Sequence, residues 1–451
     1  MTFPVINPSD GSTITELENH DSTQWMSALT DAVDAGPSWA AKTPRERSVV
    51  LTAIFESLTE HAQEIAEIIH LEAGKSVAEA LGEVSYGAEY FRWFAEEAVR
   101  LPGRFGQSPS GAGHIAVTRT PVGPVLAITP WNFPIAMATR KIAPALAAGC
   151  PVIVKPASET PLTMVKVGEL IAEIFEKFDI PPGLMSIITT TRDTELSSEL
   201  MADPRLAKVT FTGSTNVGRI LVRQSSDRLL RTSMELGGNA AFVIDESADL
   251  DEAVAGAIAA KLRNAGQVCI AANRFLVHKS IAEEFTSKLA TAMNNTAIGP
   301  VISAKQRDRI ATLVDEAIAD GALLITGGEV PASPGFFYPA TVLANVPAHS
   351  RILHEEIFGP VATITTFTDL ADGVAQANST EFGLAAYGFS DNVKAAQYMA
   401  ENLEAGMIGI NRGAISDPAA PFGGIGQSGF GREGGTEGIE EYLSVRYLAL
   451  P

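Results

Sequence analysis

The sequence predicts an α/β protein built on parallel, doubly wound β-sheets. Short apolar runs bounded by turn residues alternate with helical patterns between residues 123 and 244, as buried parallel strands and their crossover helices do. The alternation resumes between residues 275 and 326, which predicts a second α/β unit. A chain of 451 residues is too long for one ordinary core, so two or three domains are expected.

Composition narrows the class of protein. Hydrophobic residues at 46% and charged residues at 19% are typical of a globular protein with a large core. The formal charge of −20 argues against nucleic acid or an anionic membrane as a partner, so positive charge that binds an anion must be local. Two cysteines cannot form a disulfide framework, the N-terminus lacks a signal-peptide pattern, and no apolar run could cross a bilayer. We expect a cytoplasmic protein without a metal site, because the seven histidines show no paired Cys/His spacing.

The N-terminal part is predicted to be helical. Apolar residues recur at three- and four-residue spacing over 22–100, and Pro37 and Gly74 interrupt the pattern. The glycine-rich segment 101–123 contains an alternating run, 114–120, which predicts an edge hairpin.

Strands and helices then alternate. The strands expected in the first sheet are 123–130, 151–155, 185–189 and 208–212, and the helices are 135–148, 161–178 and 195–201. The second half is expected to contain strands at 240–244, 275–278 and 322–326, with helices at 250–262, 282–293 and 306–320. The last alternating run, 442–448, is expected to pair with the hairpin.

A glycine-rich turn, Gly213 to Gly218, lies at the carboxyl end of the strand at 208–212. It is expected to open a helix over 219–225, whose N-terminal amides could bind a pyrophosphate. The G-x-x-x-x-G spacing is not the common dinucleotide fingerprint. On its own the motif indicates a packing device about as readily as a phosphate site.

Cys269 is the candidate nucleophile. It lies in the stretch 263–274, between a helical run and a strand at 275–278, where a thiol can face a cleft. A free cysteine is more often a buried small hydrophobe. However, Gly266 and Gln267 just before the thiol permit a tight backbone approach that a packed core position does not require.

Five motifs occur in a fixed order: Gly213 to Gly218, Glu235-Leu236-Gly237-Gly238, Gly266-Gln267-Val268-Cys269, Glu356-Ile357-Phe358-Gly359-Pro360 and the glycine-rich segment 421–434. In these motifs, and over almost its whole length, the chain resembles the aldehyde dehydrogenase superfamily. The resemblance implies a Rossmann-type dinucleotide-binding domain, an α/β catalytic domain and a small β oligomerisation hairpin in a homodimer or homotetramer. The corresponding residues are 1–102 and 124–237, 238–430, and 103–123 and 431–451.

The resemblance implies a catalytic role for three side chains. The Cys269 thiolate attacks the aldehyde carbon, because a tetrahedral centre is a far better hydride donor than the aldehyde itself. The side-chain amide of Asn132 and the backbone N–H of Cys269 stabilise the oxyanion. After the hydride has left, Glu235 activates the water that hydrolyses the thioester.

The resemblance also assigns residues to a dinucleotide cofactor. Lys155 is expected to hydrogen-bond the adenosine ribose, Glu356 the nicotinamide ribose, and Phe358 to pack on the nicotinamide end. NAD-preferring relatives often carry Glu where this chain has Ser158, and Ser158 beside Lys155 can donate to a 2′-phosphate. NADP is therefore the expected cofactor, with NAD as the second. The expected cofactor-binding residues are Trp131, Lys155, Ser158, Gly213, Ser214, Gly218, Leu236, Glu356 and Phe358.

Three further residues match positions with which succinate-semialdehyde dehydrogenases hold the distal carboxylate of their substrate: Arg140, Arg263 and Ser416. An acidic protein needs such a local cationic clamp to accept an acidic substrate. The expected substrate is succinate semialdehyde, with glutarate semialdehyde reacting more slowly. The chain departs from its relatives at Ala271, where a second cysteine is common, in a shortened segment at 294–300, and at Arg412.

Three alternatives remain open. An aldehyde dehydrogenase for an aromatic or aliphatic aldehyde is distinguished by whether a distal carboxylate is required. A cofactor-independent cysteine esterase would need a histidine beside the thiol, and His278 is the one nearby in sequence. A non-catalytic homologue is disfavoured because Cys269, Glu235 and Asn132 occur together.

Overall fold

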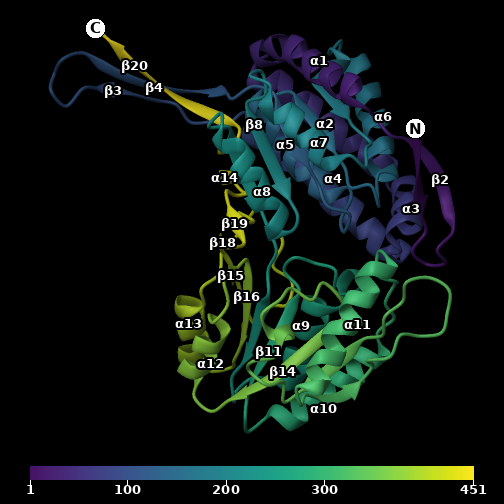
Figure 1. The fold of residues 1–451 in the computed structure, drawn as a ribbon. Helices are drawn as coiled ribbons and strands as arrows, with labels where there is room; N and C mark the ends of the chain where they lie inside the picture. The colour runs from purple at the N-terminus through teal and green to yellow at the C-terminus, as the bar shows by residue number, and fades with distance from the viewer.

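The computed structural model describes residues 1–451, which form two lobes, each built on a large β-sheet, and a projecting β arm (Figure 1). The upper lobe in Figure 1 contains the N-terminal helices and the first sheet, and the lower lobe contains the second sheet. None of the helices combines the length and apolar character that a membrane span requires.

The chain begins with an antiparallel hairpin, β1 (Thr2–Ile6) and β2 (Thr13–Glu18), which sequence patterning did not predict. The predicted helical segment follows as α1 (Ser22–Ala41), α2 (Pro44–Glu60), α3 (Ala62–Ala73) and α4 (Val77–Ala98). Capping boxes at Asp21, Thr43 and Ser76 start α1, α2 and α4. The interruption predicted at Pro37 is wrong, because Pro37 lies inside α1, whereas Gly74 does end α3 in a left-handed conformation.

The first sheet has the strand order β19-β9-β8-β5-β6-β7 and is parallel except at β19. The four expected strands are confirmed, and β9 and β19 complete the sheet. Its strands are β5 (Val125–Ile128), β6 (Val152–Lys155), β7 (Met185–Ile187), β8 (Lys208–Thr212), β9 (Arg231–Glu235) and β19 (Gly429–Phe430). Its helices are α5 (Ala136–Ala148), α6 (Leu162–Lys177), α7 (Asp193–Ala202) and α8 (Thr215–Ser226).

The second sheet has the order β12-β13-β14-β11-β10-β16-β17 and is parallel except for β12. Its strands are β10 (Ala240–Ile244), β11 (Ala272–His278), β12 (Leu323–Thr326), β13 (Thr341–Ala344), β14 (Val361–Phe367), β16 (Ala385–Phe389) and β17 (Met407–Ile410). Its helices are α9 (Leu250–Lys261), α10 (Ala282–Asn295), α11 (Ala304–Ala319), α12 (Leu370–Ala377) and α13 (Val393–Asn402). The predicted second α/β unit is therefore confirmed.

The β arm contains β3 (Arg104–Gln107), β4 (His114–Pro121) and the C-terminal β20 (Leu443–Leu450), in the order β20-β4-β3. The pairing expected between the C-terminus and the hairpin is confirmed, since β20 lies antiparallel to the whole of β4. Figure 1 shows the arm extending away from both lobes. A short pair, β15 (Phe382–Gly383) and β18 (Ile425–Gly426), and helix α14 (Glu437–Glu440) precede β20.

Candidate active site

Cys269 lies where two cavities meet. One cavity, the substrate-side cavity, has a volume of about 270 Å³ and is lined by Lys75, Glu79, Gly82, Glu83, Tyr86, Phe133, Met137, Arg140, Arg263, Asn264, Val268, Cys269, Ile270, Ser416 and Phe422. The other, the cofactor-side cavity, has a volume of about 420 Å³ and includes Trp131, Asn132, Gly213, Ser214, Glu235, Leu236, Cys269, Glu356 and Phe358. A thiol at this junction can meet ligands that arrive from both sides.

The thiol of Cys269 is poorly solvated. Burial raises its pKa to about 11, although Arg140 acts in the opposite direction. A thiol in this state is mostly protonated near neutral pH, and removal of its proton must accompany its attack on a carbonyl carbon.

The backbone before Cys269 makes a tight turn. Asn264 and Ala265 have φ values of 52° and 53°, and Gly266 has a φ of 74°. A Cβ atom at Gly266 would lie 2.2 Å from the carbonyl oxygen of Gly359. The close backbone approach predicted at Gly266 is therefore confirmed, and it explains why no side chain fits there.

Asn132 lies beside the thiol in the cofactor-side cavity. It is buried, and its Nδ2 donates one hydrogen bond to the carbonyl oxygen of Gln267 at 2.9 Å. Because an amide nitrogen carries two hydrogens, the second N–H remains to act as a donor.

Glu235, the last residue of β9, is 2% exposed, and neither of its carboxyl oxygens has a hydrogen-bond partner. Burial, followed by the negative charge of Glu433, raises its pKa well above the usual value, while Arg140 and Lys141 oppose this shift. A carboxyl group with free oxygens and a raised pKa has the properties that a general base near neutral pH requires.

The residue that sequence reasoning missed is Glu433. Its carboxylate accepts from Arg140 Nε and Lys141 Nζ, and Lys141 Nζ also donates to the Thr212 hydroxyl at 2.6 Å. Glu433 lies in the glycine-rich segment 421–434, to which the sequence assigned no catalytic or binding role. The signal in the sequence that could have identified Glu433 is its position as an acidic residue among the glycines at the end of this family motif.

The three expected substrate residues line one cavity. Arg140 is 1% exposed and stacks 3.9 Å from the centre of the Phe422 ring, and its Nη2 has no partner. Arg263 is exposed and lies over the Phe133 ring at 5.2 Å. The Ser416 hydroxyl is 3.0 Å from that of Tyr86. Arg140 was expected to bind the distal carboxylate of the substrate; the structure pairs its Nε with Glu433 and leaves its Nη2 free for a ligand.

Six of the nine expected cofactor residues line the cofactor-side cavity: Trp131, Gly213, Ser214, Leu236, Glu356 and Phe358. The rings of Trp131 and Phe358 meet edge to face, with centroids 5.3 Å apart. Burial raises the pKa of Glu356 to about 7, and its carboxylate accepts from the backbone N–H of Gly238 at 3.2 Å.

Lys155, Ser158 and Gly218 do not line either cavity. Lys155 pairs with Asp193, and the Ser158 hydroxyl is 3.3 Å from the Glu159 carboxylate. A Cβ atom at Gly218 would lie 2.4 Å from Leu236 Cδ2, so this glycine has a packing role.

The glycine-rich turn opens α8 at Thr215, and the start predicted at residue 219 is therefore wrong. Ser214 is the N-cap, and its hydroxyl accepts from the N–H of Val217 at 3.4 Å. This cap starts α8 inside the glycine-rich motif, so the free backbone amides of the first turn of α8 lie at the cofactor-side cavity.

Comparison with known proteins supplies the class of enzyme. The family model for the aldehyde dehydrogenase family matches residues 1–448. The chain is 49% identical to a succinate-semialdehyde dehydrogenase of Paenarthrobacter nicotinovorans, covering 94% of this chain and 96% of that one. It is 41% identical to a 3-sulfolactaldehyde dehydrogenase of Pseudomonas putida, covering 100% and 93%.

A solved structure of an NADP-dependent enzyme from E. coli superimposes with a TM-score of 0.96 at 40% identity, covering 99% of this chain and 94% of that one. The family match extends over nearly the whole sequence, and the relatives have nearly the same length. The chain therefore belongs to the aldehyde dehydrogenase family and is an enzyme that oxidises aldehydes with NAD(P)⁺.

Proposed function

We propose that the chain oxidises succinate semialdehyde to succinate, with NADP as its preferred cofactor and NAD as the second. The observation that carries the proposal is that Arg140, Arg263 and Ser416 line the same cavity as Cys269. An aldehyde at the thiol can then direct a distal carboxylate to these groups. Arginine suits this purpose because its planar guanidinium binds carboxylates with two parallel hydrogen bonds.

The cofactor-side cavity fits a dinucleotide. Gly213 and Ser214 present the N-terminus of α8, where backbone amides and the helix dipole favour a pyrophosphate. A Cβ atom at Gly237 would lie 2.8 Å from Glu356 Oε2, so the glycine keeps this carboxylate accessible to ribose hydroxyls. When bound here, NAD(P)⁺ supplies the hydride acceptor that converts the thiohemiacetal into a thioester.

Three side chains perform the remaining chemistry. The Cys269 thiol loses its proton to solvent as its Sγ adds to the aldehyde carbon and forms the thiohemiacetal, while the free N–H of Asn132 and the Cys269 N–H stabilise the oxyanion. Glu235, with both carboxyl oxygens unpartnered, takes a proton from the water that hydrolyses the thioester. Succinate then leaves and the thiol is restored.

The proposed preference for NADP over NAD depends on Lys155, the last residue of β6, and on Ser158 in the loop that follows. Ser158 stands where NAD-preferring relatives often carry a glutamate that binds the ribose 2′-hydroxyl of the cofactor. Lys155 can neutralise the 2′-phosphate of NADP. Asp193 holds Lys155 in this structure, so a 2′-phosphate must displace that carboxylate. The NADP-dependent relative from E. coli supports the same assignment by similarity.

A second candidate substrate is 3-sulfolactaldehyde. The relative from Pseudomonas putida bears that name, and a sulfonate is a distal anion that the same cations could bind. Glutarate semialdehyde, one methylene longer than succinate semialdehyde, is expected to react more slowly.

The test is steady-state oxidation of succinate semialdehyde, 3-sulfolactaldehyde and butyraldehyde with NADP or NAD. Succinate semialdehyde should exceed butyraldehyde by at least about tenfold in kcat/KM, which corresponds to about 1.4 kcal/mol of transition-state binding. Arg263→Ala should erase that margin, whereas Arg412→Ala, at an exposed arginine outside both cavities, should leave it intact. Equal rates with butyraldehyde would refute the substrate, and turnover by Cys269→Ala would refute the mechanism.

We also propose that the β arm forms the contact between subunits of a homodimer or homotetramer. Phe105, Val445 and Tyr447 on it are 62–69% exposed, which is unusual for large apolar side chains grouped on one sheet. The proposed domain division is 1–102 with 124–237, then 238–430, with 103–123 and 431–451 as the arm.

A further inference from the structure

The turn that carries the nucleophile has an unfavourable backbone conformation. Asn264, Ala265 and Gly266 are three consecutive residues with positive φ, and two of them have side chains. Left-handed conformations of such residues persist only where the surroundings hold them. The contacts of Asn264 therefore determine where Cys269, five residues later, is placed.

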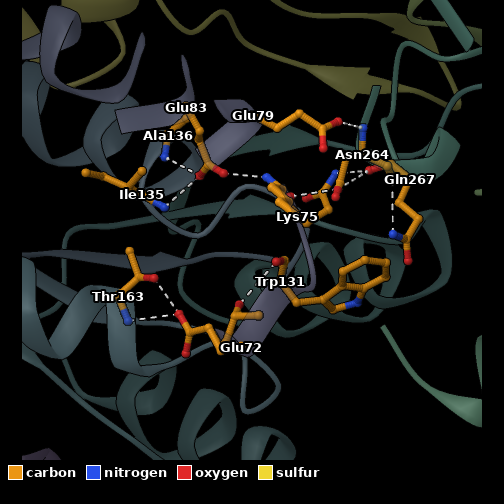
Figure 2. A network of polar contacts seen from close by, with 12 residues as sticks. Glu72, Lys75, Glu79, Glu83, Trp131, Ile135, Ala136, Thr163, Asn264 and Gln267 are labelled. Carbon is orange, nitrogen blue, oxygen red and sulfur yellow. Dashed lines mark hydrogen bonds and ion pairs between the residues drawn. The ribbon is translucent and has the colours of Figure 1, made fainter. Parts of the chain in front are cut away.

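Several hydrogen bonds hold Asn264. Its side-chain Nδ2 donates to the carbonyl oxygen of Asn132 at 2.9 Å, and its own carbonyl oxygen accepts from Gln267 Nε2 at 3.0 Å. Its backbone N–H donates to Glu79 Oε1 at 3.0 Å. The first bond joins the turn to the loop that carries Asn132, the second lies within the turn itself, and the third connects the turn to helix α4. Figure 2 shows the Glu79 carboxylate directed at Asn264.

Glu79 is itself held in place. Its other oxygen, Oε2, accepts from the Ser76 backbone N–H at 3.2 Å and from the Ser76 hydroxyl at 2.9 Å, which completes the capping box of α4. An ionised acceptor makes these hydrogen bonds stronger than neutral ones. Glu79 also lines the substrate-side cavity, so its carboxylate is a fixed part of the site.

The same helix supports the opposite side of that cavity. Glu83, one turn further along α4, accepts from the backbone N–H groups of Ile135 and Ala136 at 3.0 and 3.3 Å, at the start of α5. Helix α5 carries Arg140. Figure 2 shows the two carboxylates of α4 reaching these separate segments.

We propose that Glu79 is a positioning residue that holds the Asn264 amide, and through it the Cys269 turn, in the reactive geometry. The inference rests on the proposed role of Cys269 as the nucleophile. Without Glu79 the strained turn loses its connection to α4, and the thiol moves relative to the Asn132 amide. Displacements of about 1 Å at a reacting centre can cost about 10²-fold in rate.

The experiment compares wild type with Glu79→Ala, Glu79→Gln, Ser76→Ala and Cys269→Ala. Two quantities are measured: steady-state turnover, and the rate at which uncharged iodoacetamide alkylates Cys269, followed by mass spectrometry of its peptide. Ser76→Ala is the matched control, because it removes the helix cap and one hydrogen bond to Glu79 Oε2 but leaves the bond from the Asn264 N–H to Glu79 Oε1. Glu79→Gln keeps an acceptor oxygen for that amide.

Glu79→Ala should lower kcat at least about tenfold, with a smaller change in KM, and should change the alkylation rate at least about tenfold in either direction, because the position and exposure of the thiol change together. Glu79→Gln and Ser76→Ala should stay within about threefold of wild type, although Ser76→Ala should lower Tm as the cap is lost. An alkylation rate in Glu79→Ala equal to that of wild type would overturn the proposal, as would equal losses in Glu79→Ala and Ser76→Ala.

Two results separate this inference from the proposed function. If Cys269→Ala still turns over, the proposed mechanism fails. If Cys269→Ala is inactive while Glu79→Ala is normal, the positioning role alone fails. A Glu79→Ala protein with lower KM for succinate semialdehyde and normal alkylation would make Glu79 a repelling charge in the cavity and would also overturn the proposal.

Discussion

Burial controls the titration of the residues around the thiol. It raises the pKa of Cys269 to about 11 and that of Glu235 well above its ordinary value. Burial also acts on Glu433, but Lys141 and Arg140 outweigh it and lower the pKa of that carboxyl. The pKa values of these two buried glutamates are therefore shifted in opposite directions, which makes the ionised Glu235 carboxylate the stronger base and keeps Glu433 ionised beside its cations.

The raised pKa of Cys269 predicts how the rate of its alkylation depends on pH. Only the thiolate is nucleophilic, so below a pKa of about 11 its fraction rises tenfold for each pH unit. Alkylation of Cys269 by iodoacetamide should therefore increase about 100-fold from pH 7 to 9 in the protein without cofactor. The urea-unfolded protein serves as the control, and its alkylation rate should be half-maximal near pH 8.5 and level off about one pH unit higher. A plateau at pH 7 to 8 in the folded protein would contradict the prediction.

Glu235→Gln should separate the two halves of the reaction. The thioester should still form, because Cys269 and Asn132 are intact, and one equivalent of reduced cofactor per site should appear in a burst. The following steady rate should fall about 10² to 10⁴-fold, the usual contribution of a general base. Stopped-flow absorbance measures both phases. Loss of the burst itself would mean that Glu235 acts before the thioester is made.

At the scale of elements, helix α8 packs against Leu236, the residue after β9, and this contact shapes the cofactor-side cavity. Gly218 in α8 lies against Leu236, which lines that cavity. Gly218→Ala should therefore displace Leu236, cost about 1–3 kcal/mol of stability and weaken cofactor binding, as measured by denaturation and by titration calorimetry.

Gly82→Ala is the matched control for this change. Gly82 is inside α4, and a Cβ atom there would meet nothing within 4 Å. This substitution should stabilise the protein by about 0.5–1 kcal/mol, because alanine favours a helix interior. Equal stability effects at both positions would show that the contact with Leu236 is unimportant.

Several elements could be predicted from the sequence, and the exceptions have physical reasons. The strands of the first sheet were found because buried parallel strands are mostly short apolar runs between turn residues, as in 125–128 and 152–155. The hairpin of β1 and β2 was missed, since most of its side chains are exposed and its pattern is weak. The start of α8 was misplaced because Ser214 caps the helix within the glycine motif.

At the scale of the whole molecule, the exposed apolar side chains of the β arm predict that subunits associate through it. Val445→Lys with Tyr447→Lys should dissociate the oligomer, because charges placed on an apolar contact must be desolvated when subunits meet. Light scattering measures the mass. The control is Val393→Lys, at an isolated apolar residue that is 79% exposed at the start of α13. If the arm variant keeps the wild-type mass, the subunit contact lies elsewhere.

The sequence by itself determined the α/β class, the succession of most strands and helices and, by resemblance, the family and the candidates Cys269, Glu235 and Asn132. These features depend on local periodicity and on motifs whose residues are adjacent in the chain. The tertiary structure decided which groups that lie far apart in the chain meet. Glu433 pairs with Arg140, Asp193 with Lys155 and Glu79 with the Asn264 amide. Because such contacts arise from chain crossings and burial, a local pattern can mark a residue such as Glu433 but not the partner with which it pairs.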